Sequence, residues 1–124
     1  MNEESFLDAA EEGDINTVRK GLEDGLDANA SDEHHRTALM KAAKHGHIDI
    51  VQILLREGAE VNSRDNRGTS ALYWASNNGH HEIVQLLIKN HSDVAVIDDR
   101  GWSAKDQAGS HHYDEIVDLL EKAE

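Results

Sequence analysis

The segment TALMKAAKHGHIDIV, residues 37–51, carries the signals of two short helices joined by a tight turn. Thr37 stands directly before the alanine-containing stretch 38–45, where a hydroxyl N-cap is favoured. Gly46 follows that stretch and supplies the left-handed C-cap conformation at little steric cost. The apolar residues of stretch 48–57 then recur at helical spacing on one face. We therefore predict one helix over each stretch, with the turn at Gly46.

The same pattern returns when the chain is shifted against itself by 33 residues. A fixed period of this length indicates a repeat architecture, in which each repeat is one supersecondary unit. It divides a single predicted domain, residues 1–124, into four repeats of about 1–31, 32–64, 65–97 and 98–124. Ser70 and Ser103 repeat the N-cap position of Thr37. The aligned columns include Ala9, Ala42, Ala75 and Ala108; Gly13, Gly46 and Gly79; Val18, Val51, Val84 and Val117; and Leu54, Leu87 and Leu120.

Two four-residue segments between the helix pairs are typical of turns. Residues 65–68 (DNRG) and 98–101 (DDRG) place Asp first and Gly fourth, as type I turns prefer. With these turns, the chain resembles the ankyrin-repeat family over roughly residues 5–123. TALMKAA at 37–43, GHIDIV at 46–51 and GAEVN at 58–62 match the three sequence signatures of that family. The resemblance implies an all-α repeat solenoid of helix-turn-helix units with β-hairpin turns. The chain also looks like the small free-standing members of the family, which have about four repeats including two terminal capping repeats.

Several positions depart from the family pattern. His35, His91 and His112 stand where other repeats have glycine, so histidine is expected to adopt a positive φ there. Lys105 occupies a core column that holds leucine in the preceding repeats, as expected of a terminal repeat with no neighbour to cover it. Residues 1–31 carry a net charge of −7 and residues 98–124 carry −5, which is consistent with polar outer faces on terminal repeats.

The composition excludes several classes of protein. The formal net charge is −13, so binding to nucleic acid or to anionic membranes through bulk electrostatics is not expected. The chain has no cysteine and therefore no disulfide or thiolate chemistry. No apolar run approaches the length of a membrane-spanning helix, and the acidic start does not resemble a signal peptide. We expect a cytoplasmic protein, or a nuclear one in a eukaryotic cell.

Nine histidines raise the question of a metal site. His47 and His80 share one column, and the family resemblance implies that such a histidine bonds backbone in the adjoining loop. Packed helices lie about 10 Å apart, so one column of histidines cannot converge on a single zinc ion. No catalytic motif is present. We predict no catalytic residue, no cofactor and no metal site, and hence no enzyme.

The remaining hypothesis is surface recognition. The family resemblance implies that hairpin tips and first helices form a concave face that binds a partner protein, the chain itself being monomeric when unbound. Trp102 is predicted to contact the partner, whereas Trp74 is either a contact residue or part of the packing between repeats, and Tyr73 is predicted to be structural. The alternative is an acidic inhibitor or immunity-type protein that masks a basic target by charge complementarity. The predicted partner-binding residues are Arg36, Lys41, Lys44, His45, Asn66, Arg67, Thr69, Trp74, Asn77, Asn78, Asp99, Arg100, Trp102, Gln107 and His111.

Overall fold

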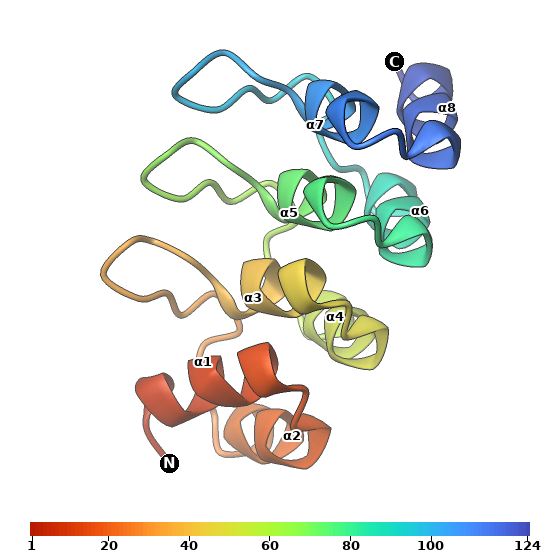
Figure 1. The fold of residues 1–124 in the computed structure, drawn as a ribbon. Coiled ribbons are helices and arrows are strands. Elements are labelled where there is room, and N and C mark those ends of the chain that lie inside the picture. The colour runs from red at the N-terminus through yellow and green to blue at the C-terminus, as the bar shows by residue number, and fades with distance from the viewer.

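A computed structural model describes all residues, 1–124, and contains eight helices in four consecutive pairs. The pairs stack side by side into two layers, with α1, α3, α5 and α7 forming an inner layer and α2, α4, α6 and α8 an outer one. Long loops project from the inner layer, away from the outer helices (Figure 1). The predicted all-α solenoid is confirmed. The helices are α1 (Glu3–Glu12), α2 (Ile15–Glu23), α3 (Ala38–His45), α4 (Ile48–Arg56), α5 (Ala71–Asn77), α6 (His81–Lys89), α7 (Ala104–Ser110) and α8 (Asp114–Lys122).

The projecting loops are hairpins held by few ladder bonds. Their β-character is confined to isolated antiparallel bridges, from Ser31 to Thr37 and from Ile97 to Ser103. Backbone hydrogen bonds also join one hairpin to the next, since the N–H of Asn66 donates to the carbonyl of His34 at 3.0 Å. Each hairpin is therefore supported by its neighbour in the stack.

The starts of the inner helices are capped in two of the three predicted cases. The Thr37 hydroxyl accepts a hydrogen bond from the N–H of Met40 at 3.2 Å. Ser103 forms a full capping box with Asp106, in which each side chain accepts a bond from the other residue's N–H. Ser70 also occupies the N-cap position, as predicted, but its side chain makes no cap bond. The two hydroxyl caps satisfy N–H groups that the helix itself leaves without partners.

One continuous apolar core runs through all four repeats. It contains the aligned valines and leucines, among them Val51 and Leu54, which are fully buried. Ala42 and Ala75 are also fully buried, and their small side chains let successive inner helices approach closely. Lys105 is only partly buried and binds Glu124 at 2.8 Å, as expected of the last repeat. None of the eight helices is long and apolar enough to cross a membrane.

Histidine side chains link the inner helices of successive repeats. Nε2 of His47 lies 2.9 Å from the carbonyl of Glu11, and Nε2 of His80 lies 2.9 Å from the carbonyl of Lys44. The prediction that these histidines bond backbone is confirmed, although the acceptors lie in the last turns of α1 and α3 rather than in loops. The rings lie so close to Gly13 and Gly46 that a Cβ there would come within 2.7–2.8 Å of them. The glycines therefore provide space as well as backbone freedom.

The three histidines at glycine-like turn positions adopt the conformation predicted for them. His35, His91 and His112 have φ values of 62°, 71° and 61°. An L-residue in this region carries a steric cost that glycine does not. These turns keep their geometry despite that cost, because the surrounding repeat fixes the path of the chain.

Candidate functional site

The hairpin tips are rigid because an aspartate organises each of them. Asp32, Asp65 and Asp98 each accept hydrogen bonds from the N–H groups two and four residues later, at 2.8–3.0 Å. The N–H groups of Gly68 and Gly101 also return to the carbonyls of Asp65 and Asp98, which confirms the predicted turns. Rigid tips present their outward side chains at fixed positions.

The last hairpin is also attached to the inner helices through a buried polar network around Asp98. The carboxylate of Asp98, which is 5% exposed, accepts bonds from the hydroxyl of Tyr73 at 3.0 Å and from Nη2 of Arg100 at 3.1 Å. Gln107 Nε2 donates to the Tyr73 hydroxyl at 2.7 Å. Burial opposes ionisation of Asp98, but the N–H groups of Trp102 and Arg100 outweigh it and lower its pKa to about 2. Burial and the same carboxylate raise the pKa of Tyr73, whose predicted structural role is consistent with this network.

Trp74 lies on α5 with two cations against its ring. The guanidinium of Arg36 is 5.4 Å and the ammonium of Lys44 is 5.0 Å from the ring centroid, both within cation–π range. The ring of Tyr73 meets it edge-on at 5.8 Å. Trp74 is partly buried and packs against the apolar core. It thus takes part in the packing between repeats and also lines a depression of about 30 Å³ together with Glu11, Arg36, Met40, Lys41 and Lys44.

Trp102 lies on the last hairpin tip and is 39% exposed, one of the largest exposures of any apolar side chain in the molecule. The guanidinium of Arg100 lies 5.8 Å from its ring centroid. Because Arg100 also donates to the Tyr73 hydroxyl at 3.2 Å, the environments of the two tryptophans are joined through Tyr73. We call Arg36, Lys44, Trp74, Arg100 and Trp102 the central cluster.

The structure removes two residues from the predicted surface. Thr69 is fully buried, because its hydroxyl donates to Asp65 at 2.5 Å. Gln107 is only 8% exposed, because its amide is bonded to Tyr73. Neither side chain can reach a partner in this conformation, so their predicted contact role was wrong.

The other predicted surface residues are exposed or partly buried, and most of them contact one another. Lys41 pairs with Asp32 at 3.1 Å, and Arg67 lies 3.7 Å from Asp99. His45 lies 3.8 Å from Glu11, and burial lowers the pKa of this histidine. His111 contacts Asn77 at 3.1 Å, and the side-chain amide of Asn78 donates to the carbonyl of Trp74 at 2.8 Å. Asn66 is exposed on its hairpin tip.

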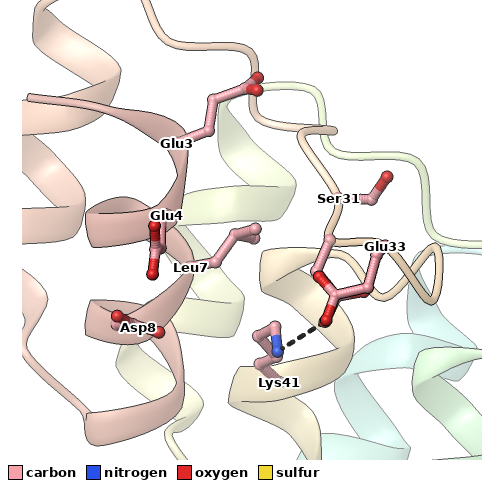
Figure 2. Close-up of a pocket in the computed structure, with 8 residues that line it drawn as sticks. Glu3, Glu4, Leu7, Asp8, Ser31, Glu33 and Lys41 are labelled. Carbon is pink, nitrogen blue, oxygen red and sulfur yellow. Dashed lines mark ion pairs between the residues drawn. The ribbon is translucent and has the colours of Figure 1, made fainter.

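An acidic pocket of about 460 Å³ lies between α1 and the first hairpin. Figure 2 shows Glu3, Glu4 and Asp8 on one helix facing Glu33 on the hairpin, with Lys41 between the two elements. Lys41 forms its ion pair here with Asp32, whose pKa is lowered by the N–H of Arg36 and by this ammonium against the opposing effect of burial. The predicted surface did not include Glu3 and Glu4. Leu7 and Ser31 complete the lining.

The residues of these features belong to the hairpin tips and the inner helices, which together form one surface of the stack. We call this surface the concave face. No group of three or more His, Asp or Glu side chains on the chain is arranged to hold a metal ion. The small depression at Trp74 has about the volume that one water molecule occupies in the liquid, so it admits the end of a side chain rather than a free substrate.

A family model of ankyrin repeats (3 copies) matches residues 6–98 and 55–124. The chain belongs to the ankyrin-repeat family. This match confirms the resemblance drawn from the three sequence signatures. A comparison with curated proteins found no match. Ankyrin repeats are generally modules for protein–protein interaction and generally lack catalytic activity. The ankyrin-repeat fold explains why variable side chains gather on the hairpin tips and inner helices while the apolar columns remain constant.

Proposed function

We propose that this ankyrin-repeat protein is a non-catalytic binding module whose concave face holds a partner protein at the central cluster. The observation that supports the proposal is the placement of both tryptophans of the chain. Trp74 and Trp102 lie on this face, each with a cationic side chain against its ring. Tryptophan and arginine are enriched among the residues that dominate binding energy.

Contacts within the chain hold both arginines of the cluster in place when no partner is bound. Arg100 is fixed by the buried carboxylate of Asp98, and Arg36 lies 3.6 Å from the buried carboxylate of Asp65. Ordering a long side chain on binding costs roughly 0.5–1.5 kcal/mol. Because these arginines are already positioned, their side chains lose less conformational entropy when a partner binds.

The test is capture of partners from the native cell extract by the wild-type protein and by two double variants. Trp74→Ala with Trp102→Ala removes both indoles, whereas Gln52→Ala with Gln85→Ala changes exposed positions of α4 and α6 on the opposite layer. We expect proteins held by the wild type and by the glutamine variant to be lost from the tryptophan variant by more than about tenfold in quantitative mass spectrometry. Equal capture by the tryptophan variant would rule out the central cluster as the binding site.

Trp74 also packs against the core, so its removal can lower stability as well as binding. Circular dichroism and thermal unfolding of each variant show whether the fold is kept. The single variant Trp102→Ala provides a second test of binding, because the exposed side chain on the hairpin tip contributes little to the core. A loss of capture in this single variant, with an unchanged melting temperature, separates contact from folding.

The acidic pocket supports a second candidate function, in which the protein masks a basic target. Five carboxylates line this pocket against one lysine. Binding through it would weaken steeply between low and high salt, because exposed charges are screened within about 10 Å at 0.1 M ionic strength. Capture that is lost in Glu3→Gln with Glu4→Gln but kept in the tryptophan variant would favour this candidate.

A further inference from the structure

Cationic side chains gather at the central cluster, although the molecule as a whole is acidic. The chain carries a formal net charge of −13, yet each indole ring has a cationic group within 5.8 Å of its centroid. At Trp74 the groups are Arg36 and Lys44, and at Trp102 the group is Arg100. Arg36 lies 3.6 Å from Asp65 and Arg100 lies 3.1 Å from Asp98, so Lys44 is the cation of the cluster that has no carboxylate partner.

Several hydrogen-bond donors around Trp74 have no acceptor within the chain. The ammonium of Lys44 has the Trp74 ring as its neighbour and forms no ion pair with a carboxylate. Nε of Arg36 and Nε1 of Trp74 are buried without a hydrogen-bond acceptor. Buried N–H groups that lack acceptors lower stability. Lys44 is partly exposed, and an incoming carboxylate is a strong acceptor for its ammonium.

The carboxylates near the cluster are already engaged. Glu11, which lines the depression at Trp74, lies 4.0 Å from Lys41 and 3.8 Å from His45. Asp65 and Asp98 are buried and hold the hairpin turns through backbone N–H groups. None of these carboxylates forms an ion pair with the ammonium of Lys44.

We propose that the central cluster binds a short acidic segment of the partner protein, and this rests on the function proposed above. An Asp or Glu carboxylate of the segment pairs with Lys44 and Arg36 beside Trp74, and an apolar side chain of the segment lies against Trp102. The depression at Trp74 has room for the end of one side chain. A polyanion such as nucleic acid does not fit, because residues 1–31 and 98–124 carry net charges of −7 and −5 that would repel its length.

The probe is a phage library of random short peptides selected on the immobilised wild-type protein at physiological salt. Recovered peptides are synthesised with a fluorescent label, and their affinity is measured by fluorescence anisotropy. We compare wild type with Lys44→Glu and with Lys89→Glu. Both lysines lie in the last turn of a helix, and the two substitutions change the net charge equally, but Lys89 is exposed on the outer helix α6. The pair therefore separates a local contact from the overall field.

We expect the recovered peptides to be enriched in Asp and Glu. Lys44→Glu should weaken their binding about tenfold and Lys89→Glu less than about twofold. Replacing the enriched acidic residue of the peptide with Lys should restore binding to Lys44→Glu. Recovery of no acidic peptide, or an equal loss in the two lysine variants, would overturn the inference.

The same measurements distinguish this inference from the function on which it rests. Neutral or basic peptides that lose binding in Trp74→Ala with Trp102→Ala would overturn the acidic partner and leave the concave-face function in place. Acidic peptides that bind the tryptophan variant at wild-type affinity would contradict both.

Discussion

The buried carboxylate of Asp98 is expected to be a major stabilising group of the last repeat. It accepts N–H bonds from Arg100 at 2.8 Å and Trp102 at 2.9 Å, and the Tyr73 hydroxyl donates to it at 3.0 Å. Asp98→Asn keeps an oxygen that can accept from the backbone. It removes the charge and places an NH₂ group among the donors of Arg100 and Tyr73, which mismatches the network.

The magnitude follows from the lowered pKa of Asp98. A shift from 3.8 to about 2 corresponds to roughly 2–3 kcal/mol at 1.36 kcal/mol per unit of pKa. Because the folded pKa lies below the unfolded one, this stability is fully present above pH 3.8. It is lost as the pH falls from there through about 2. The substitution should therefore cost roughly 2–3 kcal/mol at pH 7 and roughly half of that at pH 3.

Urea denaturation followed by circular dichroism at several pH values between 7 and 3 measures this cost. Asp99→Asn is the matched control, because it removes the same charge from the neighbouring residue, which is exposed and pairs only with Arg67 at 3.7 Å. We expect the control to cost no more than about 0.5 kcal/mol at any pH. A cost of Asp98→Asn equal to that of the control, or one that does not fall towards pH 3, would refute the assigned role of the buried carboxylate.

Three further substitutions test the links between repeats by urea denaturation. Gly46→Ala should cost at least about 1 kcal/mol more stability than Gly58→Ala. The φ values are similar, +80° and +88°, but only at Gly46 would the new Cβ lie 2.8 Å from His80. Equal costs would contradict this steric role. His80→Phe keeps a ring but removes the group that bonds the carbonyl of Lys44, so a loss of about 1–2 kcal/mol is expected and no loss would argue against that bond. His112→Gly should raise stability by up to about 1 kcal/mol by relieving its φ of 61°, whereas a lowered urea midpoint would show that the imidazole makes a compensating contact.

The helices could be predicted closely because periodicity and capping act locally. Residues 38–45 form α3 as predicted, and α4 ends at Arg56 with Glu57 as its C-cap, one residue before the predicted end. The 33-residue period then carried these boundaries to the other repeats. Even the positive φ of His112 followed from its position in a glycine column.

The surface could be predicted less well, because a repeat column fixes where the backbone lies and not where the side chain points. Thr69 shares a column with the partly buried Arg36 and the exposed Trp102, yet its short hydroxyl turns inward to Asp65. Gln107 shares a column with Trp74, but it faces the interior because the buried hydroxyl of Tyr73 needs bonding partners. Asp65 belongs to the same repeat as Thr69, whereas Tyr73 belongs to the repeat before Gln107, and the residue types in one column reveal neither contact.

The acidic pocket was missed for a related reason. Glu3 and Glu4 come from the start of α1 and meet the hairpin of the next repeat across space. The 33-residue alignment compares equivalent positions in different repeats, so it does not reveal contacts between unlike positions. Only the stacking of α1 beside the hairpin places these carboxylates opposite Glu33.

The concave face changes sign at Lys41, which lines both the acidic pocket and the depression at Trp74. An acidic segment bound at the central cluster and continuing towards α1 would meet Asp8 and the glutamates of the pocket. A partner segment that is acidic at one end and basic at the other would match both regions, so the two candidate functions describe one bipolar site. Extending an acidic peptide with lysines at one end should therefore tighten binding, and extending that end with glutamates should weaken it, each by several-fold at low salt. Anisotropy titrations of peptides extended at either end measure this effect. If added charge at neither end changes the affinity, the two regions act separately.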